Sequence, residues 1–305
     1  MKRILVTGAS GFIGRHTLPI LLARGFEVHA VALNHDLPAI HGLRRHRADL
    51  LDSVAVARLV ADVMPTHLMH LAWYAVPGKY QSAEVNYLWR DAGVVLLEAF
   101  TRAGGIRAVF AGSCFEYDLT LPYCSETLTR CDPATVYGQC KLALAQLVTG
   151  RQPEGLSTAW ARIFWLYGPH EAPSRLVPSV ILPLMRGERA RCTHGRQIRD
   201  FLHVEDVAGA FVALLESPVR GIVNIASGDP VTIRFLVSTL AALLDARDRI
   251  DFGALEAPPE DPDAVIADTG ILHKSVGWTP RWRLEDGLAA TIQWWRDHGA
   301  VAAAG

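Results

Sequence analysis

Runs of apolar residues alternate along the first half of the chain with longer segments whose apolar residues recur at helical spacing. The runs show almost no alternation with polar residues, which is typical of strands that are covered on both faces. Strands are expected at residues 3–7, 27–33, 43–48, 67–72, 108–112 and 158–164, and helices at residues 12–24, 53–63, 83–103 and 135–148. This alternation predicts an α/β fold in which a doubly wound parallel sheet carries helices on both faces.

The pattern changes after about Leu166, where proline and glycine become frequent. A helix expected at 203–216 and a strand expected at 222–226 have the pattern of elements that return to the sheet. Helices are also expected at 233–244 and 284–296, around an acidic, proline-rich loop at 256–263. Because no repeat or flexible linker separates the parts, we predict a first domain of residues 1–166, with 203–226 returning to it, and a smaller interwoven C-terminal lobe of residues 167–202 and 227–305.

Composition narrows the class of protein. Half of the 305 residues are hydrophobic, and the net charge of −1 gives no basic excess for binding nucleic acid or an anionic membrane. No segment is apolar for long enough to span a bilayer, and the first apolar run is too short for a signal peptide. The five cysteines are odd in number and contain no CxxC pair, which indicates reduced thiols in a cytoplasmic protein; no metal site is expected.

A glycine-rich turn, Thr7-Gly8-Ala9-Ser10-Gly11-Phe12-Ile13-Gly14, separates the first expected strand from the first helix. A dinucleotide-binding fold needs glycines there for a tight turn, for close approach of a phosphate and for packing of the helix on the strand. The amides at the start of the helix then face the pyrophosphate. An ordinary strand-to-helix turn is the alternative, but the flanking elements favour a cofactor-binding Rossmann turn that includes Ser10, Phe12 and Ile13.

The choice of nicotinamide cofactor depends on the end of the second strand, where an NAD site usually has an Asp or Glu for the ribose hydroxyls. The corresponding position is about Ala32, and no acid lies there. This favours NADP(H) and leaves NAD(H) open; candidate contacts to a 2′-phosphate are Asn34, His35, Arg15 and Arg44. Asp49 and Leu50 follow the third strand, where a carboxylate would meet the adenine amino group, although a helix-capping aspartate explains Asp49 equally well.

Tyr137 and Lys141 are four residues apart in an expected helix, so their side chains share one face. Tyrosine has a pKa of about 10, and a neighbouring ammonium group favours the phenolate. Such a pair can move a proton beside a nicotinamide while the lysine also binds a ribose. Ser113 follows the strand at 108–112, at the sheet edge where open α/β sheets bind ligands, and its hydroxyl is a candidate for holding the substrate oxygen. Without the glycine turn, the pair would be read as a solvated helix face and Ser113 as a strand-end cap.

These residues resemble the extended short-chain dehydrogenase/reductase family, in particular its nucleotide-sugar epimerases, dehydratases and reductases, over nearly the whole chain. Further matching positions are His70-Leu71-Ala72, Asn86, Ser113 with Tyr117, Arg162, Tyr167-Gly168-Pro169, Leu176-Val177-Pro178, Arg199-Asp200-Phe201, Asn224 and Gly277-Trp278-Thr279-Pro280. The resemblance implies that Leu71, Ala72 and Asn86 contact the cofactor and that Val177 and Arg199 lie near a nucleoside-diphosphate sugar. It also implies a homodimer formed through the helices at 83–103 and 135–148.

Departures from the family pattern bear on the reaction. The family's 4,6-dehydratases place Asp-Glu directly after the serine or threonine, where this chain has Cys114 and Phe115, and Glu116 is one residue out of register. The reductases that also epimerise carbons 3 and 5 use a cysteine two residues after the serine and a histidine where Arg175 stands, which leaves only His170 as an imidazole nearby. Elimination is therefore not expected, and Cys114 is expected to be a buried, inert thiol.

Trp165 is a further departure, since the family usually has there the asparagine of an Arg-x-x-Asn segment that contacts the substrate. An aromatic ring cannot make the hydrogen bonds of an amide, so Trp165 either packs on the sugar or fills the boundary of the lobe. The candidate substrate-binding residues are Ser113, Cys114, Phe115, Trp165, Arg175, Val177 and Arg199.

The leading hypothesis for function is an NADPH-dependent reductase of a keto group, at carbon 4, of a nucleotide-linked deoxysugar, with Tyr137 as the acid and Ser113 and Lys141 as its partners. The alternative is a 4-epimerase that holds NAD tightly and uses the same three residues. A 4,6-dehydratase is less well supported because the elimination acids are missing. A catalytically silent scaffold relative is less well supported because the three catalytic candidates are all present.

Overall fold

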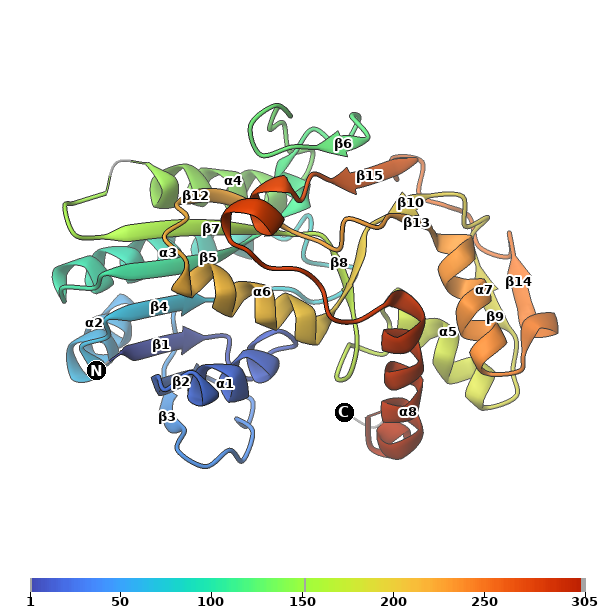
Figure 1. Cartoon of the computed structure of the whole chain (residues 1–305), viewed down its shortest axis with the longest axis horizontal. Coiled ribbons are helices and arrows are strands. Elements are labelled where there is room, and N and C mark those ends of the chain that lie inside the picture. The colour runs from blue at the N-terminus through green and yellow to red at the C-terminus, as the bar shows by residue number, and fades with distance from the viewer. Residues whose placement is uncertain (1, 151, 303–305) are drawn as a thin grey trace.

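The computed structural model describes residues 2–150 and 152–302 and confirms the predicted α/β fold (Figure 1). Seven parallel strands form the central sheet in the order β12-β7-β5-β4-β1-β2-β3. They are β1 Arg3–Thr7, β2 Glu27–Ala32, β3 Arg44–Arg47, β4 His67–His70, β5 Arg107–Ser113, β7 Ser157–Ile163 and β12 Gly221–Ile225. From β1 the chain first adds β2 and β3 on one side and then β4, β5, β7 and β12 on the other, so the order of strands reverses between β1 and β4. Sheets of this kind bind ligands at the carboxyl ends of the strands at such a switch point.

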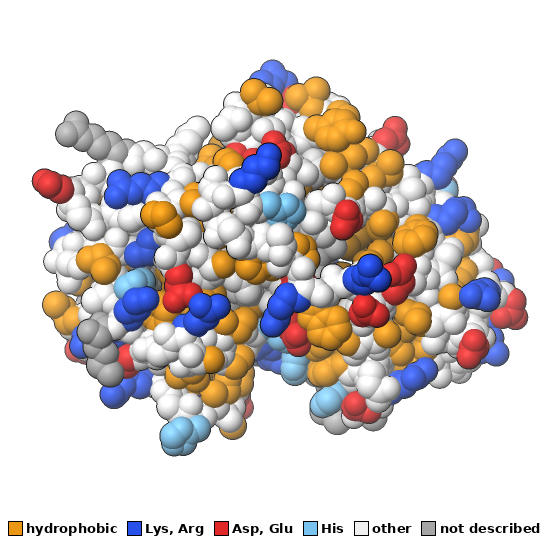
Figure 2. Space-filling model, viewed as in Figure 1, with side chains coloured by type: hydrophobic (Ala, Val, Ile, Leu, Met, Phe, Trp, Pro, Cys, Tyr) orange, Lys and Arg blue, Asp and Glu red, His pale blue; other side chains and the backbone are white. Residues whose placement is uncertain are grey.

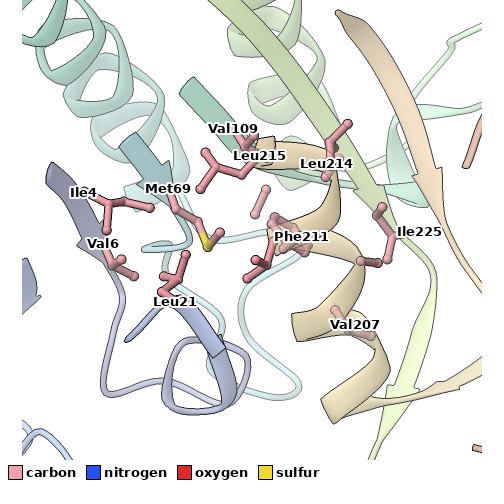
Figure 3. Packing of buried hydrophobic residues seen from close by; sticks show 14 of the residues in the cluster. Ile4, Val6, Leu21, Met69, Val109, Val207, Phe211, Leu214, Leu215 and Ile225 are labelled. Carbon is pink, nitrogen blue, oxygen red and sulfur yellow. The ribbon is translucent and has the colours of Figure 1, made fainter. Parts of the chain in front are cut away.

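Helices cover both faces of the sheet, as the unbroken apolar runs predict. One face carries α1 Gly14–Ala23 and α6 Val204–Glu216, and the other carries α2 Ser53–Val63, α3 Val85–Arg102 and α4 Val136–Thr149. On the first face, Phe211 and Leu21 pack with Ile4 and Met69 (Figure 3). The second core contains Leu5, Leu96, Phe110 and Leu144. Because both faces are buried, the strands need no polar alternation.

Most of the remaining elements build the C-terminal lobe beside the sheet (Figure 1). Its helices are α5 Leu176–Met185, α7 Ile233–Leu243 and α8 Leu284–Ala302, with the short helical turn η2 Arg247–Arg249. Two other helical turns lie with the sheet: η1 Cys114–Glu116 follows β5, and η3 Ile271–Ser275 packs on the first core. The short strands of the lobe are β6 Tyr123–Cys124, β8 Trp165–Tyr167, β9 Ala190–Cys192, β10 Ile198–Arg199, β11 Phe201–His203, β13 Val231–Thr232, β14 Ile250–Phe252 and β15 Ala264–Ala267. Ile181, Leu240 and Trp295 lie in a separate core that joins the three helices.

The chain returns from the lobe to the sheet, because β12 pairs with β7 and α6 packs beside α1. On the face shown in Figure 2, cationic and anionic side chains are interspersed, as the near-zero net charge implies. Among the residues that the structure describes, no helix combines the length and apolar character needed to cross a membrane, and no group of three or more metal-ligating side chains is present.

Phe211 provides a test of the first core. Its side chain is fully buried between α6 and the sheet, so we expect Phe211→Ala to lower the free energy of unfolding by about 3–5 kcal/mol in a urea titration. Phe235→Ala is the matched control, because Phe235 lies on α7 with 47% of its surface exposed and should cost about 0.5 kcal/mol or less. Equal losses from the two changes would contradict this assignment of the core.

Candidate active site

The glycine turn has the geometry of a phosphate cradle. Gly8 adopts φ +66°, and a Cβ at this position would lie 2.6 Å from the backbone nitrogen of Ala72, so no other residue fits without displacing the end of β4. The Gly11 amide donates to the Gly8 carbonyl at 3.0 Å, and α1 begins at Gly14 with Ile13 as its N-terminal cap residue. The first turn of α1 therefore begins directly after the carboxyl end of β1, which places its free backbone amides where a dinucleotide pyrophosphate fits.

The second half of the turn joins the sheet domain to the lobe. The Arg15 guanidinium donates to the Ser10 carbonyl at 3.1 Å and contacts Nδ1 of His170. Phe12 packs edge-on against His16, with ring centroids 6.4 Å apart. The Arg15 guanidinium is thus engaged on the side of the lobe, which does not match its predicted contact with a 2′-phosphate at the end of β2. His170 is engaged here as well, which removes it as a partner for Cys114.

The carboxyl ends of β2 and β3 are where the sequence predicts the adenosine part of the cofactor. Ala32 pairs in register with Arg47, and Asn34 follows as an exposed residue. Arg44, by contrast, begins β3 and its Nε lies 2.7 Å from the carboxylate of Glu27 at the start of β2. Arg47, not Arg44, is therefore the cation at the edge that a 2′-phosphate would occupy. Arg47 was not among the predicted contacts, because its place at this edge depends on the register of β3 against β2.

Four other residues are predicted to contact the cofactor, and their side chains differ in how far they are exposed to solvent; they are Asp49, Leu50, Leu71 and Ala72. The Asp49 carboxylate is exposed and accepts from the Leu51 amide at 2.9 Å, while Leu50 is buried against the core of the second face. The Leu71 amide donates to the Thr7 carbonyl at 3.2 Å, and Ala72 meets the glycine turn. Asp49 thus caps a local turn, and its side chain remains accessible from solvent.

Ser113, Tyr137 and Lys141 are brought together by the first turn of α4. Thr135 caps this helix by accepting from the Gly138 amide at 3.1 Å. A Cβ on Gly138 would lie 2.2 Å from the carbonyl oxygen of Phe115, so only glycine lets α4 approach the loop that follows β5. This close approach sets Tyr137 beside Ser113, the last residue of β5. Gly138 is a positioning residue that the sequence analysis missed, although it lies between the two catalytic candidates.

The electrostatics of these three residues suit proton transfer. Burial raises the pKa of Tyr137, and contact with the Ser113 hydroxyl lowers it. Burial lowers the pKa of the Lys141 ammonium, and the charge of Glu116 acts in the opposite direction. The Lys141 ammonium donates to the Ala111 carbonyl at 2.7 Å and lies 5.8 Å from the centre of the Tyr137 ring. The phenol is therefore protonated at neutral pH and has the Ser113 hydroxyl and the Lys141 amino group beside it.

Glu116 points away from the substrate side, as its shifted register predicts. Its carboxylate accepts from Nε of Arg162 at 2.7 Å, from Nε1 of Trp160 at 2.9 Å and from the Ser113 amide at 2.7 Å. The side chains of Glu116 and Arg162 are 0% and 1% exposed. This acid holds the loop after β5 in place and is not available to remove a proton from a sugar.

Aromatic side chains form the wall around the Tyr137 ring. Tyr80 lies edge-on at 4.9 Å between ring centroids, and Phe115 lies at 6.3 Å. Trp165 packs on Phe115 at 6.1 Å, which favours a place in this wall over a purely structural role. Cys114 is 2% exposed and unpaired, and burial raises the pKa of its thiol, so it is an inert core residue, as expected.

Three more of the predicted substrate-binding residues come from the lobe, and they differ in how exposed their side chains are. Arg175 lies with its guanidinium 5.4 Å from the centre of the Tyr80 ring and is partly exposed. Arg199 is 1% exposed, donates to Asp261 at 2.6 Å and stacks over Trp165 at 4.9 Å. Val177 is buried in the core of the lobe, so its side chain does not line the site. Arg175 is therefore the accessible cation near Tyr137.

Asn86 has a different role from the one that sequence matching implies. Its amide nitrogen donates to the carbonyls of Tyr80 and Ala83, at 2.6 and 2.7 Å, and its oxygen accepts from Nε1 of Trp73 at 2.8 Å. Asn86 is fully buried. It fixes the loop after β4 and orients Trp73, a residue that the sequence analysis passed over although it directly follows the matched His-Leu-Ala motif.

The sheet, the glycine turn and the Ser–Tyr–Lys arrangement together define an extended short-chain dehydrogenase/reductase of the nucleotide-sugar type. The model of the NAD dependent epimerase/dehydratase family matches residues 4–226. The chain belongs to this family, and the recognition made from its motifs is confirmed.

Individual relatives cover nearly all of the chain. UDP-glucuronic acid decarboxylase 1 of Xenopus tropicalis is 28% identical over 97% of this chain and 72% of its own length. The solved structure of MoeE5 in complex with UDP-glucuronic acid and NAD is 32% identical, with a TM-score of 0.84 over 97% of this chain and 99% of that one. The UDP-glucose 4-epimerase of Thermus thermophilus in complex with NAD is 26% identical, with a TM-score of 0.83 over 96% and 99%.

The buried ion pair beside the site yields a stability test. We expect Arg162→Met to lower the free energy of unfolding by about 3–5 kcal/mol, because it leaves the Glu116 carboxylate buried without a counter-ion. The double variant Glu116→Gln with Arg162→Met should recover part of that loss in the same urea titration. Arg186→Met breaks the ion pair with Glu188, in which both side chains are more than half exposed; it is the control and should shift the midpoint little. The single variant Glu116→Gln completes the comparison. If the loss of unfolding free energy in the double variant equals the sum of the losses in Glu116→Gln and Arg162→Met, this role for Glu116 is contradicted.

Proposed function

We propose that this protein reduces a keto group, at carbon 4, of a nucleoside-diphosphate-linked deoxysugar with NADPH, and that Tyr137 is the proton donor. The observation that carries the proposal is that Tyr137 has the Ser113 hydroxyl and Lys141 beside it, while the nearby acid Glu116 is bound to Arg162. Reduction of a ketone needs one hydride and one proton. Elimination or epimerisation next to the ketone needs further acids or bases.

Each of the three residues has a task in this reaction. When bound, the cofactor supplies the hydride to the carbonyl carbon. The Tyr137 hydroxyl donates its proton to the carbonyl oxygen as charge develops there, and the Ser113 hydroxyl donates a hydrogen bond to the same oxygen. The Lys141 ammonium stabilises the phenolate that remains, and its free N–H groups are available to a ribose. Because burial raises the pKa of Tyr137, its hydroxyl stays protonated through neutral pH.

The preference for NADP(H) is supported by the ends of β2 and β3. Neither strand ends in a carboxylate, so the acid that usually binds the two ribose hydroxyls of NAD is missing from both strand ends. Arg47 lies in register with Ala32 at this edge and forms no ion pair among the described residues. An exposed guanidinium that is free for a bidentate contact suits a phosphate monoester.

The preference for a deoxysugar is supported by the aromatic wall. Tyr80 and Phe115 lie edge-on to Tyr137, and Trp165 packs on Phe115. Such a surface accepts a methyl group and the apolar face of a sugar ring, and it offers few partners to an additional hydroxyl.

A second candidate function is 4-epimerisation with tightly held NAD, and the comparisons favour it. The 32% identical MoeE5 structure and the T. thermophilus epimerase structure both contain NAD. The same Ser113, Tyr137 and Lys141 would oxidise carbon 4 and reduce it again from the other face. Such an enzyme regenerates its own cofactor, so it gains nothing from NADPH, and the identity of the cofactor separates the two candidates.

We also propose that the protein is a cytoplasmic homodimer. Tyr87 and Leu88 on α3 are 42% and 56% exposed, and Leu147 on the adjacent α4 is 54% exposed. These side chains would be covered if the two helices paired with those of a second copy. All five cysteines are unpaired, which fits a reducing compartment. The molar mass from light scattering tests the dimer, and a monomer at micromolar concentration would contradict it.

Removal of the Tyr137 hydroxyl tests the proposed proton donor. We expect Tyr137→Phe to lower turnover of a 4-keto-6-deoxysugar nucleotide by about 10²–10⁴-fold, because the developing oxyanion loses its acid. Tyr80→Phe is the matched control; it removes a hydroxyl from the neighbouring ring, keeps the edge-on packing and should retain most of the turnover. Turnover that survives Tyr137→Phe would exclude the mechanism.

The cofactor preference can be tested without a sugar. We expect NADPH to bind more tightly than NADH in a fluorescence titration, and Arg47→Ala to weaken NADPH binding by about tenfold with little effect on NADH. Arg44→Ala changes the same residue type on the same strand, but at the edge where Arg44 pairs with Glu27, and should leave both affinities unchanged. Purified protein that retains NAD and does not oxidise NADPH in the presence of keto-sugars would favour the epimerase.

A further inference from the structure

Trp73 occupies a defined place above the catalytic helix. It follows the His70-Leu71-Ala72 motif at the end of β4, and its Nε1 donates to the Asn86 oxygen at 2.8 Å. Because Asn86 is fully buried and donates to two backbone carbonyls, the position of its oxygen is fixed. The edge of the indole is thus anchored, and the ring cannot turn without breaking a buried hydrogen bond.

The face of this indole lies on the Lys141 ammonium. The distance from Nζ to the Trp73 ring centroid is 3.7 Å, well inside the range of a cation–π contact. Lys141 is only 3% exposed and has one hydrogen bond, to the Ala111 carbonyl at 2.7 Å. Among the described residues, no carboxylate lies within ion-pair distance of Nζ, so carbonyl and aromatic groups make up its immediate surroundings.

Charged groups farther from Lys141 do not supply a counter-ion. Glu116 on η1 acts to raise the pKa of Lys141, but its carboxylate is already bound to Arg162 on β7. His70 on β4 is neutral, because burial and the nearby lysine charge lower its pKa to about 3. The other titratable side chains around the pair are uncharged at neutral pH, since burial raises the pKa of each; they are Tyr137, Tyr80 and Cys114.

We propose that Trp73 is a positioning residue for the proton transfer: its indole face, anchored through Asn86, holds the Lys141 side chain and keeps it charged beside Tyr137. An ammonium group buried without a carboxylate loses stability in its charged form, and an aromatic face recovers part of that loss. A neutral amine at this place would not stabilise a phenolate, and it would bind a ribose hydroxyl more weakly than the ammonium group does. The consequence for turnover rests on the proposed function, whereas the effect on the charge of Lys141 does not.

The chain contains four lysines, Lys2, Lys79, Lys141 and Lys274, and Lys141 is the buried one. Uniform labelling of lysine with ¹³C at the ε carbon therefore gives four signals in an NMR titration of the full-length protein, and Lys141→Arg assigns the signal of interest. We expect that signal to titrate below the other three. In Trp73→Leu its midpoint should fall further, by about one pH unit, because a desolvated cation–π contact is worth at least that much.

Two further variants make the result specific to the indole face. Trp73→Phe keeps an aromatic face but loses the hydrogen bond to Asn86, so its midpoint should lie between those of the wild type and Trp73→Leu. Trp89→Leu is the matched control, because Trp89 lies 6.5 Å from Trp73 on α3 and has no contact with Nζ. A Lys141 midpoint in Trp73→Leu within 0.2 units of the wild type, in protein that melts cooperatively, would overturn the proposal, with 0.2 units being about the precision of such a titration.

The pH profile of turnover supplies a second readout. In Trp73→Leu the upper pH limit of kcat should move down by the same amount as the Lys141 midpoint, because the phenolate partner loses its charge earlier. If the midpoint moves but no keto-sugar is turned over by the wild type, the proposed function fails and the role of Trp73 stands. If the wild type is active and the midpoint does not move, the proposed function stands and the role of Trp73 fails.

Discussion

The buried ion pair between Glu116 and Arg162 is the interaction on which the candidate site depends. Its carboxylate binds the guanidinium, the Trp160 indole and the Ser113 amide at once, so it ties the end of β5 to β7. A charge buried to this extent is tolerated only with such a set of partners. By holding the loop after β5, the pair presents Ser113 at the sheet edge and offers the Phe115 carbonyl against which Gly138 packs. Gly138 lies in the first turn of α4, and this helix carries Tyr137 and Lys141.

Much of this arrangement follows from the sequence. Strands buried on both faces leave continuous apolar runs, and the strand–helix alternation predicts the seven-stranded sheet apart from its exact bounds. The glycine turn and the Tyr–Lys spacing predict the site because each depends on local backbone geometry. The recognised family is confirmed by the match over residues 4–226.

The rest of the site depends on contacts between distant segments. The strands of the lobe are two to four residues long, too short to leave a period in the sequence. Arg47 becomes significant only when β3 is placed in register with β2, and Arg44 then falls at the wrong edge. The roles of Asn86 and Trp73 depend on the path of the loop after β4, and the burial of Val177 depends on the packing of α5 in the lobe.

The chemistry of the site is limited by what surrounds Tyr137. Its neighbours are aromatic rings, a serine and a lysine that has no paired carboxylate. Tyr137 can therefore exchange one proton for each hydride that is transferred. The same limitation applies to both candidate functions, which differ in whether the hydride leaves with the product or returns to its starting carbon.

Deuterium transfer distinguishes those two outcomes. The protein is mixed with NADPH that carries deuterium on the transferring face of carbon 4 and with a nucleoside-diphosphate 4-keto-6-deoxysugar, and the sugar product is analysed by mass spectrometry. The proposed reduction predicts one deuterium in each product sugar and one NADP⁺ formed for each. Unchanged keto-sugar and NADPH, together with interconversion of the two 4-hydroxy epimers of that sugar nucleotide when no cofactor is added, would contradict the reductase and identify an epimerase.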